Sequence, residues 1–221
     1  MIKIENTHVS GFEQAIRGMR NPMNSWDKSD SKRVNATDFK LGSNDFELMS
    51  NLAAAGPVHA KYRRMITVWV DITAPLYFWK EFDTYKVGTV SNSCSTMHKI
   101  AAKEFTLDDF SHEHLNGYGL EIFKGVIDYL NLSREVYVNG LHEDEEPMMP
   151  VTKPKDINWW WQMIQMLPSS YNQRRTIMLN YEVLANMYHY RKEHKLDEWR
   201  DLCEWIKTLP VSEIITVGRK E

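Results

Sequence analysis

Two polar side chains near the C-terminus, Asn180 and Arg191, have a spacing that could serve ligand binding. They lie in a stretch, 176–206, that contains no Gly or Pro and has periodic apolar residues, so a continuous helix is predicted. At 100° per residue the two side chains return to within about 20° of one face, about 16 Å apart along the axis. One inorganic ion cannot touch both, whereas an extended nucleotide-like ligand could. The plainer interpretation is that both lie on the wet side of an amphipathic helix.

A second candidate segment, 85–98, is dense in hydroxyl-bearing residues and contains Gly88. Ser, Thr and Asn side chains compete for backbone hydrogen bonds, so this run does not favour a helix. Its short polar side chains suit a loop that lines a ligand site, and an ordinary Ser/Thr-rich turn is the alternative. His98, at its end, is a candidate polar contact. No base can be assigned to Cys94, which is more simply interpreted as a buried, inert thiol.

Metal chemistry has little support in the sequence. The acidic run 143–146 has no spaced His, so a solvated loop is the simpler interpretation. His189 and His194 are five residues apart, which takes them off a common helical face. No catalytic residue and no metal ligand is assigned from the residues alone.

Hydrophobic periodicity and turn chemistry predict the elements that must position these side chains. The predicted strand 65–72 has an apolar face at period two, and a capping box of Asn44 and Glu47 is expected to start a helix. The predicted strands are 1–6 and 65–72; the predicted helices are 11–19, 45–55, 76–83, 97–103, 118–130 and 156–166; and 20–42 is expected to be a long polar loop.

Length and composition set outer limits on what the chain can be. Its 221 residues suit one domain over residues 1–221, with one sizeable core. The net charge of −3 gives no electrostatic case for binding long nucleic acid. No apolar run approaches the ~20 residues that span a bilayer, and the N-terminus lacks the apolar core of a signal peptide. Two cysteines form no disulfide framework, so the expected compartment is the reducing cytoplasm.

The C-terminal stretch resembles the signature of the flavin-dependent thymidylate synthases. In that family Leu-Pro precedes a helix that carries Asn-x-Arg, then Asn or His, then Arg. Here Leu167-Pro168 is followed at the family's spacing by Asn180, Asn186 and Arg191. The resemblance implies flavin contacts for the two Asn residues and a joint flavin and nucleotide contact for Arg191. Glu182 replaces the family's middle Arg, which would invert the charge that faces the cofactor.

The segment 72–98 resembles the family's other motif, Arg-His-Arg followed after a spacer by Ser-x-Asn-Glu-x-Ser-x-Arg. The Arg-His-Arg place falls on 84–86, and Asn92 and Ser95 match the later part. The implied cofactor contacts in this segment are Tyr85 and Lys86. The implied substrate contacts are Glu81, Asn92, Ser93, Ser95 and His98, together with Arg191.

The resemblance implies a fold, a reaction and an assembly. The fold is α+β, a single domain with a central β-sheet flanked by helices. The reaction is reductive methylation of dUMP, in which FAD relays a one-carbon unit from methylene-tetrahydrofolate to C5 of the uracil and NADPH is a further co-substrate. The cofactor carries the chemistry and the protein positions the reactants, so no protein nucleophile is required. The family also implies a homotetramer whose active sites form between subunits.

Departures from the family pattern fall on charged positions. Ser93 stands in the place of Glu, and Met97 and Ile164 stand in places of Arg, one of which would bind phosphate. Two alternatives therefore stay open: a flavoenzyme of the same fold that acts on another pyrimidine nucleotide, and a non-catalytic relative that binds nucleotide or flavin. The cations that could replace the missing Arg are Lys86, His98, Arg174, Arg175 and Arg191.

Overall fold

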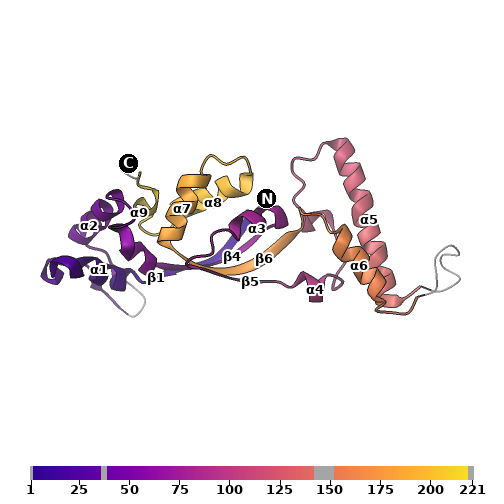
Figure 1. Ribbon diagram of the computed structural model, residues 1–221, viewed down its shortest axis with the longest axis horizontal. Helices are drawn as coiled ribbons and strands as arrows, with labels where there is room; N and C mark the ends of the chain where they lie inside the picture. Colours follow the sequence, from indigo (N-terminus) through magenta and orange to yellow (C-terminus); the bar gives the residue numbers. More distant parts are fainter. Residues whose placement is uncertain (1, 36–38, 142–151, 219–221) are drawn as a thin grey trace. The chain divides into compact units, whose positions relative to one another are not determined.

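The computed structural model describes residues 2–35, 39–141 and 152–218, which form a β-sheet with helices on it (Figure 1). The predicted α+β class, with a central sheet flanked by helices, is confirmed. The strands are β1 (Lys3–Ser10), β2 (Lys32–Arg33), β3 (Phe39–Lys40), β4 (Thr67–Pro75), β5 (Thr89–Ser93) and β6 (Asn172–Asn180). The α-helices are α1 (Phe12–Arg20), α2 (Ser43–Ala54), α3 (Leu76–Phe82), α4 (Thr96–Lys99), α5 (Gly117–Asn139), α6 (Ile157–Met166), α7 (Tyr181–Arg191), α8 (Asp197–Lys207) and α9 (Glu213–Thr216). The 3-10 helices are η1 (Asn21–Met23), η2 (Trp26–Lys28), η3 (Ala60–Met65) and η4 (Leu107–Asp109).

The chain divides into two compact units. Unit 1 consists of Thr73–Lys80 and Ser93–Arg174, and unit 2 consists of Ile2–Ile72, Glu81–Asn92 and Arg175–Glu221. Strands β4 and β6 therefore contribute residues to both units. A single domain over residues 1–221 stays a prediction.

Strand β4 provides much of the apolar core of unit 2. The main sheet has the order β1-β4-β6-β5. The predicted alternation along β4 is confirmed, because Val68, Val70 and Ile72 are buried while Trp69 between them is exposed. A strand with one buried face needs a helix layer on that face. The residues that complete this core include Leu184, Met187, Leu202 and Ile206, from α7 and α8.

The predicted continuous helix over 176–206 is wrong. Its first part is the end of β6, where Ile177 and Leu179 are buried at period two, and the chain enters α7 only after Asn180. A second break, at 192–196, separates α7 from α8. The sequence of this segment contains no helix breaker. It forms a strand because β4 and β5 lie on either side of it and pair with its backbone, and these distant partners do not enter a prediction from local propensity.

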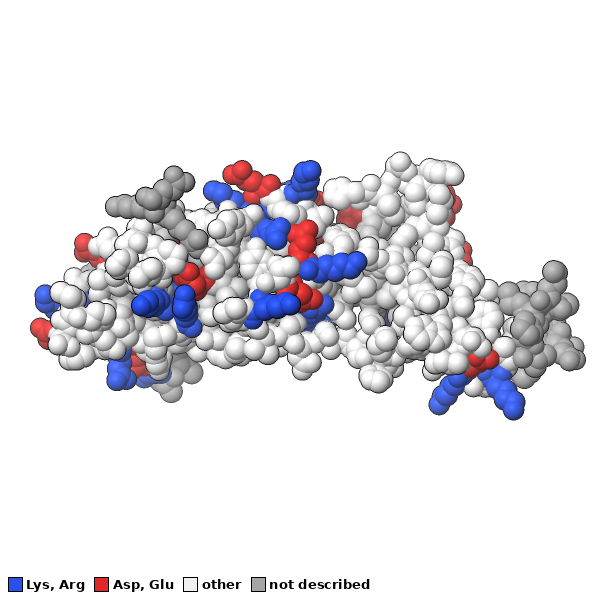
Figure 2. All heavy atoms as spheres, viewed as in Figure 1, with Lys and Arg blue, Asp and Glu red and all other residues white. Residues whose placement is uncertain are grey.

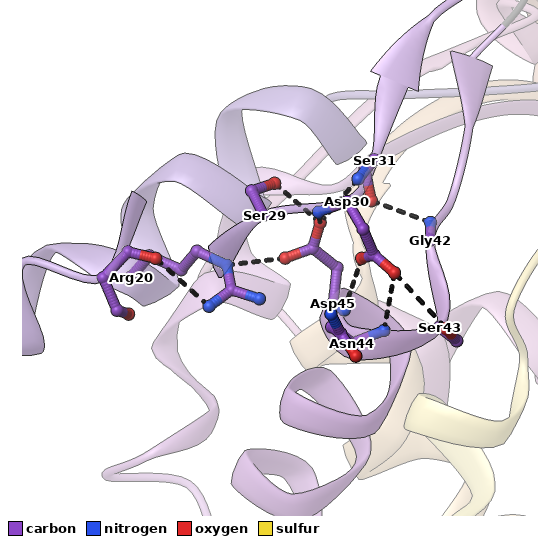
Figure 3. A network of polar contacts seen from close by, with 9 residues as sticks. Arg20, Ser29, Asp30, Ser31, Gly42, Ser43, Asn44 and Asp45 are labelled. Carbon is purple, nitrogen blue, oxygen red and sulfur yellow. Dashed lines mark hydrogen bonds and ion pairs between the residues drawn. The ribbon is translucent and has the colours of Figure 1, made fainter. Parts of the chain in front are cut away.

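The predicted loop over 20–42 contains η1, η2 and a two-stranded antiparallel sheet of β2 and β3. A network of polar contacts around the buried Asp45 ties this segment to the start of α2 (Figure 3). Asp45 accepts hydrogen bonds from Arg20 Nε at 2.6 Å and from Ser29 Oγ at 2.7 Å. Asp30 in turn accepts from the backbone N–H of Asn44 at 2.9 Å.

The predicted capping box of Asn44 and Glu47 is wrong. The N-cap of α2 is Gly42, which has no side chain to cap the helix. Instead, the Asp30 carboxylate of the preceding segment accepts hydrogen bonds from the backbone N–H groups of Asn44 and Asp45 in the first turn. A Cβ built on Gly42 would lie 2.2 Å from Asp30 Cγ, so a residue with a side chain would displace this cap. A cap supplied across fourteen residues leaves no local sequence signature.

In unit 1, α5 and α6 pack along each other (Figure 1). Helix α5 continues beyond the predicted 118–130 to Asn139, whereas the prediction of α6 is confirmed, with Asp156 as its N-cap. The expectation of no helix over 85–98 holds only in part, because α4 begins at Thr96, and α4 is shorter than the predicted helix 97–103. The apolar core of this unit comprises Ile100, Phe105, Phe110, Ile127, Leu130 and Met163.

Candidate functional site

In unit 2, three of the residues predicted to bind ligand converge at the end of α7. The guanidinium of Arg191 donates from Nη1 to Glu81 Oε2 at 2.8 Å and from Nε to the Tyr85 hydroxyl at 3.0 Å. Its central carbon lies 4.7 Å from the centroid of the Trp199 ring, an arrangement that adds a cation–π attraction. These four residues, Glu81, Tyr85, Arg191 and Trp199, are called the Arg191 cluster below.

Glu81 is the acceptor that organises the Arg191 cluster. Its Oε2 also accepts from the indole Nε1 of the buried Trp199 at 2.9 Å and lies 3.4 Å from His194 Nε2. The backbone N–H of Leu196 donates to His194 Nδ1, so the neutral imidazole carries its proton on Nε2, facing Glu81. One carboxylate thus fixes an arginine, an indole and an imidazole, and the guanidinium is held in a single orientation.

Arg191 keeps donor capacity within this arrangement. Its Nη2 has no hydrogen-bond partner in the part of the chain that the structure describes, and its side chain is 21% exposed. A guanidinium carries five N–H donors in a planar fork. The fork can therefore be held by Glu81 and Tyr85 while it presents an edge to a ligand.

Asn180 connects the Arg191 helix to the 85–98 segment. Its Oδ1 accepts from Val183 N at 3.1 Å and so caps the first turn of α7. On its other side, a Cβ built on Gly88, which has φ +79°, would lie 2.6 Å from Asn180 Nδ2. A glycine at this position permits close approach of the two segments. The predicted mid-helix position of Asn180 is corrected, because it lies where β6 meets α7.

The other predicted contacts of unit 2 are less closely grouped. Asn186 is half-buried on α7. Lys86 lies exposed in the turn before β5, and Asn92 lies exposed within β5.

Glu182, which was expected to place a negative charge against the cofactor, forms a buried ion pair inside unit 2. Glu182 is 7% exposed and accepts from Arg63 Nε at 2.8 Å, with Arg63 Nη2 also 2.7 Å away in the ion pair. Arg63, itself 1% exposed, donates from Nη1 to the carbonyl of Ile214 at 2.9 Å. The carboxylate is neutralised inside unit 2.

Unit 1 contains a small pocket of about 200 Å³ beside α4. Of the predicted substrate contacts, Ser95 lines it, while Ser93 and His98 are exposed and are not among the lining residues. Ser95 Oγ accepts from His98 N at 3.3 Å, and Gln173 Nε2 donates to the carbonyl of Cys94 at 3.0 Å. The remaining lining residues are Thr73, Thr96, Lys99, Lys103, Asp109, Tyr171, Asn172 and Arg174.

Sequence reasoning missed Trp199, Lys99 and Lys103. Trp199 follows the signature by one helix, and only its contact with Arg191 distinguishes it from the other indoles. Lys99 stands three residues after Thr96, a spacing that places both on one helical face, but the predicted helix 97–103 began after Thr96. In the described residues, no group of three His, Cys, Asp or Glu side chains could hold a metal ion, and the run 143–146 lies outside them.

No protein-family model matches this sequence, and no curated protein matches it either. Several solved structures, however, match its fold. ThyX, a thymidylate synthase from Helicobacter pylori solved with FAD and dUMP, aligns with 97% of this chain and 96% of its own, at 17% identity and a TM-score of 0.64. A second structure of that flavin-dependent enzyme covers 94% of each chain at a TM-score of 0.63. The chain has the thymidylate synthase X fold.

A further structure with this fold is the UMP/dUMP methylase PolB from Streptomyces cacaoi, bound with 5-Br dUMP. It shares 13% identity, covers 97% of this chain and 94% of its own, and has a TM-score of 0.58. At these identities the likeness shows the fold alone, and the function rests on the site.

Charge on the visible face of the molecule is mixed. Basic and acidic side chains lie interleaved over α7 and α8 (Figure 2). None of the helices in the described ranges has the length and apolar character needed to cross a bilayer.

Proposed function

We propose that this protein is a flavin-dependent enzyme that methylates C5 of dUMP reductively, with FAD as cofactor, methylene-tetrahydrofolate as one-carbon donor and NADPH as reductant. The observation that carries the proposal is the Arg191 cluster, which stands on the thymidylate synthase X fold at the position where the sequence signature expects a joint flavin and nucleotide contact. An arginine fork held by a carboxylate and a phenol suits the carbonyl and phosphate oxygens of both ligands.

The residues present fit the groups that such an enzyme holds. Arg191 offers Nη2 from a fixed guanidinium. The half-buried Asn186 lies five residues earlier on the same helix, about 140° around its axis. The close approach of Gly88 to Asn180 brings backbone of the 85–98 segment beside α7. Bound FAD would supply the hydride and the relay of the one-carbon unit; the side chains of this chain bind and orient the two rings.

The protein itself supplies no nucleophile in this proposal. Cys94 is exposed rather than buried, which corrects the sequence-based expectation. Within the described residues no hydrogen bond or ion pair joins its thiol to a basic side chain that would activate it. Cys203 is buried, and burial raises the pKa of its thiol to about 11. We also propose a cytoplasmic homotetramer with sites between subunits, which sedimentation equilibrium tests directly.

The experiment is a turnover assay. Protein reconstituted with FAD is mixed with dUMP, methylene-tetrahydrofolate and NADPH, and dTMP is quantified by chromatography. The proposal predicts dTMP formation that depends on each of the four components. Protein that binds FAD and dUMP but forms no dTMP would reduce the proposal to a binding protein.

UMP is the second substrate to test, because a structure with this fold is a UMP/dUMP methylase. The same assay with UMP, run in parallel, measures the preference between ribose and deoxyribose. Methylation of UMP at a higher kcat/KM than dUMP would change the assigned substrate and leave the reaction class unchanged.

A further inference from the structure

The two carboxylate oxygens of Glu81 have different surroundings. Oε2 accepts from Arg191 Nη1 at 2.8 Å and from the indole of the fully buried Trp199 at 2.9 Å. Oε1 forms no hydrogen bond or ion pair with any residue that the structure describes, and the Glu81 side chain is 36% exposed. One oxygen is therefore committed to holding the Arg191 cluster, while the other is an acceptor that a ligand can reach.

A free donor accompanies this free acceptor. Arg191 Nη2 belongs to the guanidinium that binds Glu81 Oε2 through Nη1, and Nη2 itself has no hydrogen-bond partner in the described ranges. The hydrogen bond between Nη1 and Oε2 keeps the carboxylate and the guanidinium next to each other. A planar ring that lies against this pair can therefore donate to Oε1 and accept from Nη2.

Cytosine offers the groups that this pair requires. Its 4-amino group is a donor at one corner of the ring, and the neighbouring N3 and O2 are both acceptors. When the amino group donates to Glu81 Oε1, both acceptors lie on the side of the Arg191 guanidinium. A carboxylate that accepts from the 4-amino group is also the usual protein partner of cytosine.

Uracil meets the same pair less favourably. Its only ring donor on this edge, N3–H, lies between two carbonyl oxygens. If N3–H donates to Glu81 Oε1, one carbonyl can face Arg191 Nη2, but the other is left beside the carboxylate, where the negative charge repels it. Uracil can therefore bind, but with a repulsive contact that cytosine avoids.

We infer that the Arg191 cluster binds a 4-aminopyrimidine nucleotide, dCMP, in addition to dUMP, and that Glu81 is the residue that determines this specificity. The placement of a pyrimidine against Arg191 rests on the proposed function. The choice of base rests on the contacts of Glu81, which as a carboxylate paired with Arg191 offers acceptors and no donor.

The variant E81Q tests this assignment because it reverses the polarity of the free position. Arg191 and Trp199 both donate to Oε2, so the amide oxygen of Gln would take that place and its NH2 group would face the ligand. Calorimetry on protein loaded with FAD should show that the wild type binds dCMP at least as tightly as dUMP. E81Q should weaken dCMP binding about 10- to 100-fold and keep the dUMP affinity within about threefold. The control E204Q, at an exposed glutamate of α8 that pairs with Lys207, should change neither affinity.

A second measurement changes the ligand instead of the protein. The 2-pyrimidinone deoxynucleotide has a hydrogen in place of the 4-amino group and otherwise matches dCMP. It should bind the wild type about 10- to 100-fold more weakly than dCMP, because Glu81 Oε1 then faces no donor. In E81Q this disadvantage should vanish.

The outcomes separate the base preference from the proposed function. A wild type that binds dUMP more tightly than dCMP, or a dCMP affinity that is unchanged in E81Q, would overturn the inference and leave the proposed function standing. Glu81-dependent dCMP binding in protein that forms no dTMP from dUMP would uphold the base preference and refute the proposed reaction. Binding of neither nucleotide would refute both.

Discussion

At the scale of single residues, Arg191 is the most completely defined part of the candidate site. Glu81, Tyr85 and Trp199 fix its guanidinium from three directions before any ligand binds. A side chain that is already ordered loses little rotamer entropy on binding, which on flexible side chains costs about 0.5–1.5 kcal/mol each. Preorganisation of this kind favours a ligand-binding role over a purely structural one.

Replacing Arg191 with Lys should weaken ligand binding while leaving the fold intact. An ammonium cannot bond Glu81 and Tyr85 in a planar fork while stacking on Trp199. The affinities for FAD and dUMP should fall about 10- to 100-fold, measured by flavin fluorescence and calorimetry. R200K, at an exposed arginine that pairs with Asp197, is the control. Unchanged FAD and dUMP affinities in R191K would remove Arg191 from the site.

The sequence predicted some of these residues and could not predict others. Arg191 lies more than a hundred positions after Glu81 and Tyr85. The three were expected in one site, and Arg191 donates to both of the others. Trp199 was missed because its place in the cluster comes from its contact with Arg191, which spacing along the chain does not encode. The ion pair of Glu182 with Arg63 could not be foreseen either, since the two residues are 119 positions apart.

At the scale of elements, the Arg63–Glu182 ion pair holds three parts of unit 2 together. Arg63 at the end of η3 reaches Glu182 in the first turn of α7 and the carbonyl of Ile214 in α9. Glu182 also lies near the positive end of the α7 dipole, which favours its charge. The pair thereby fixes the start of the helix that ends at Arg191.

Breaking this pair from one side should be strongly destabilising. R63M leaves a buried carboxylate without its cation, and the free energy of unfolding in urea should fall by about 3–5 kcal/mol. The double variant R63M/E182M should lose much less, because no charge is left buried. K207M, which breaks the exposed pair with Glu204, should change stability by less than about 1 kcal/mol. Equal losses in the single and double variants would contradict the account.

The network around Asp45 should make stability depend on acid. Although burial opposes ionisation, hydrogen bonds from Ser31, Ser29 and Arg20 hold the pKa of Asp45 below its ordinary value. A lowered folded-state pKa gives stability that is complete above the unfolded pKa of about 3.9 and is lost as pH falls through the folded value. D45N should be less stable by about 3 kcal/mol at pH 7 and should lack this part of the acid dependence. D27N, which changes an exposed carboxylate, is the control. If D45N lost stability at low pH to the same extent as the wild type, the acid dependence would come from other carboxylates.

Elements bounded by local signals were predicted well, and those bounded by distant partners were not. Strand β4 and helices α3 and α6 follow from periodicity and from a cap at Asp156. Strand β6 was predicted as a helix because its identity depends on neighbours in the sheet. The start of α2 was misassigned because Asp30 supplies its cap from an earlier segment.

At the scale of the whole molecule, the fold was predictable from resemblance, whereas composition set only limits. Two matched segments, roughly 48–98 and 167–199, indicated the fold later found over 97% of the chain. They carried this signal although overall identity to those structures is only 17%, because spacing between glycines, prolines and amides is set by backbone geometry. Charged positions diverged from the family pattern, and spacing along the chain does not identify replacements for them.

The central claim, that this chain binds a flavin against a pyrimidine nucleotide, is tested most directly by the visible absorption spectrum of the purified protein. After incubation with FAD and gel filtration, the flavin bands should elute with the protein at about one FAD per chain, and dUMP should shift them. R191K should retain less flavin under the same conditions. Protein that elutes colourless from saturating FAD, with no spectral response to dUMP, would contradict the account.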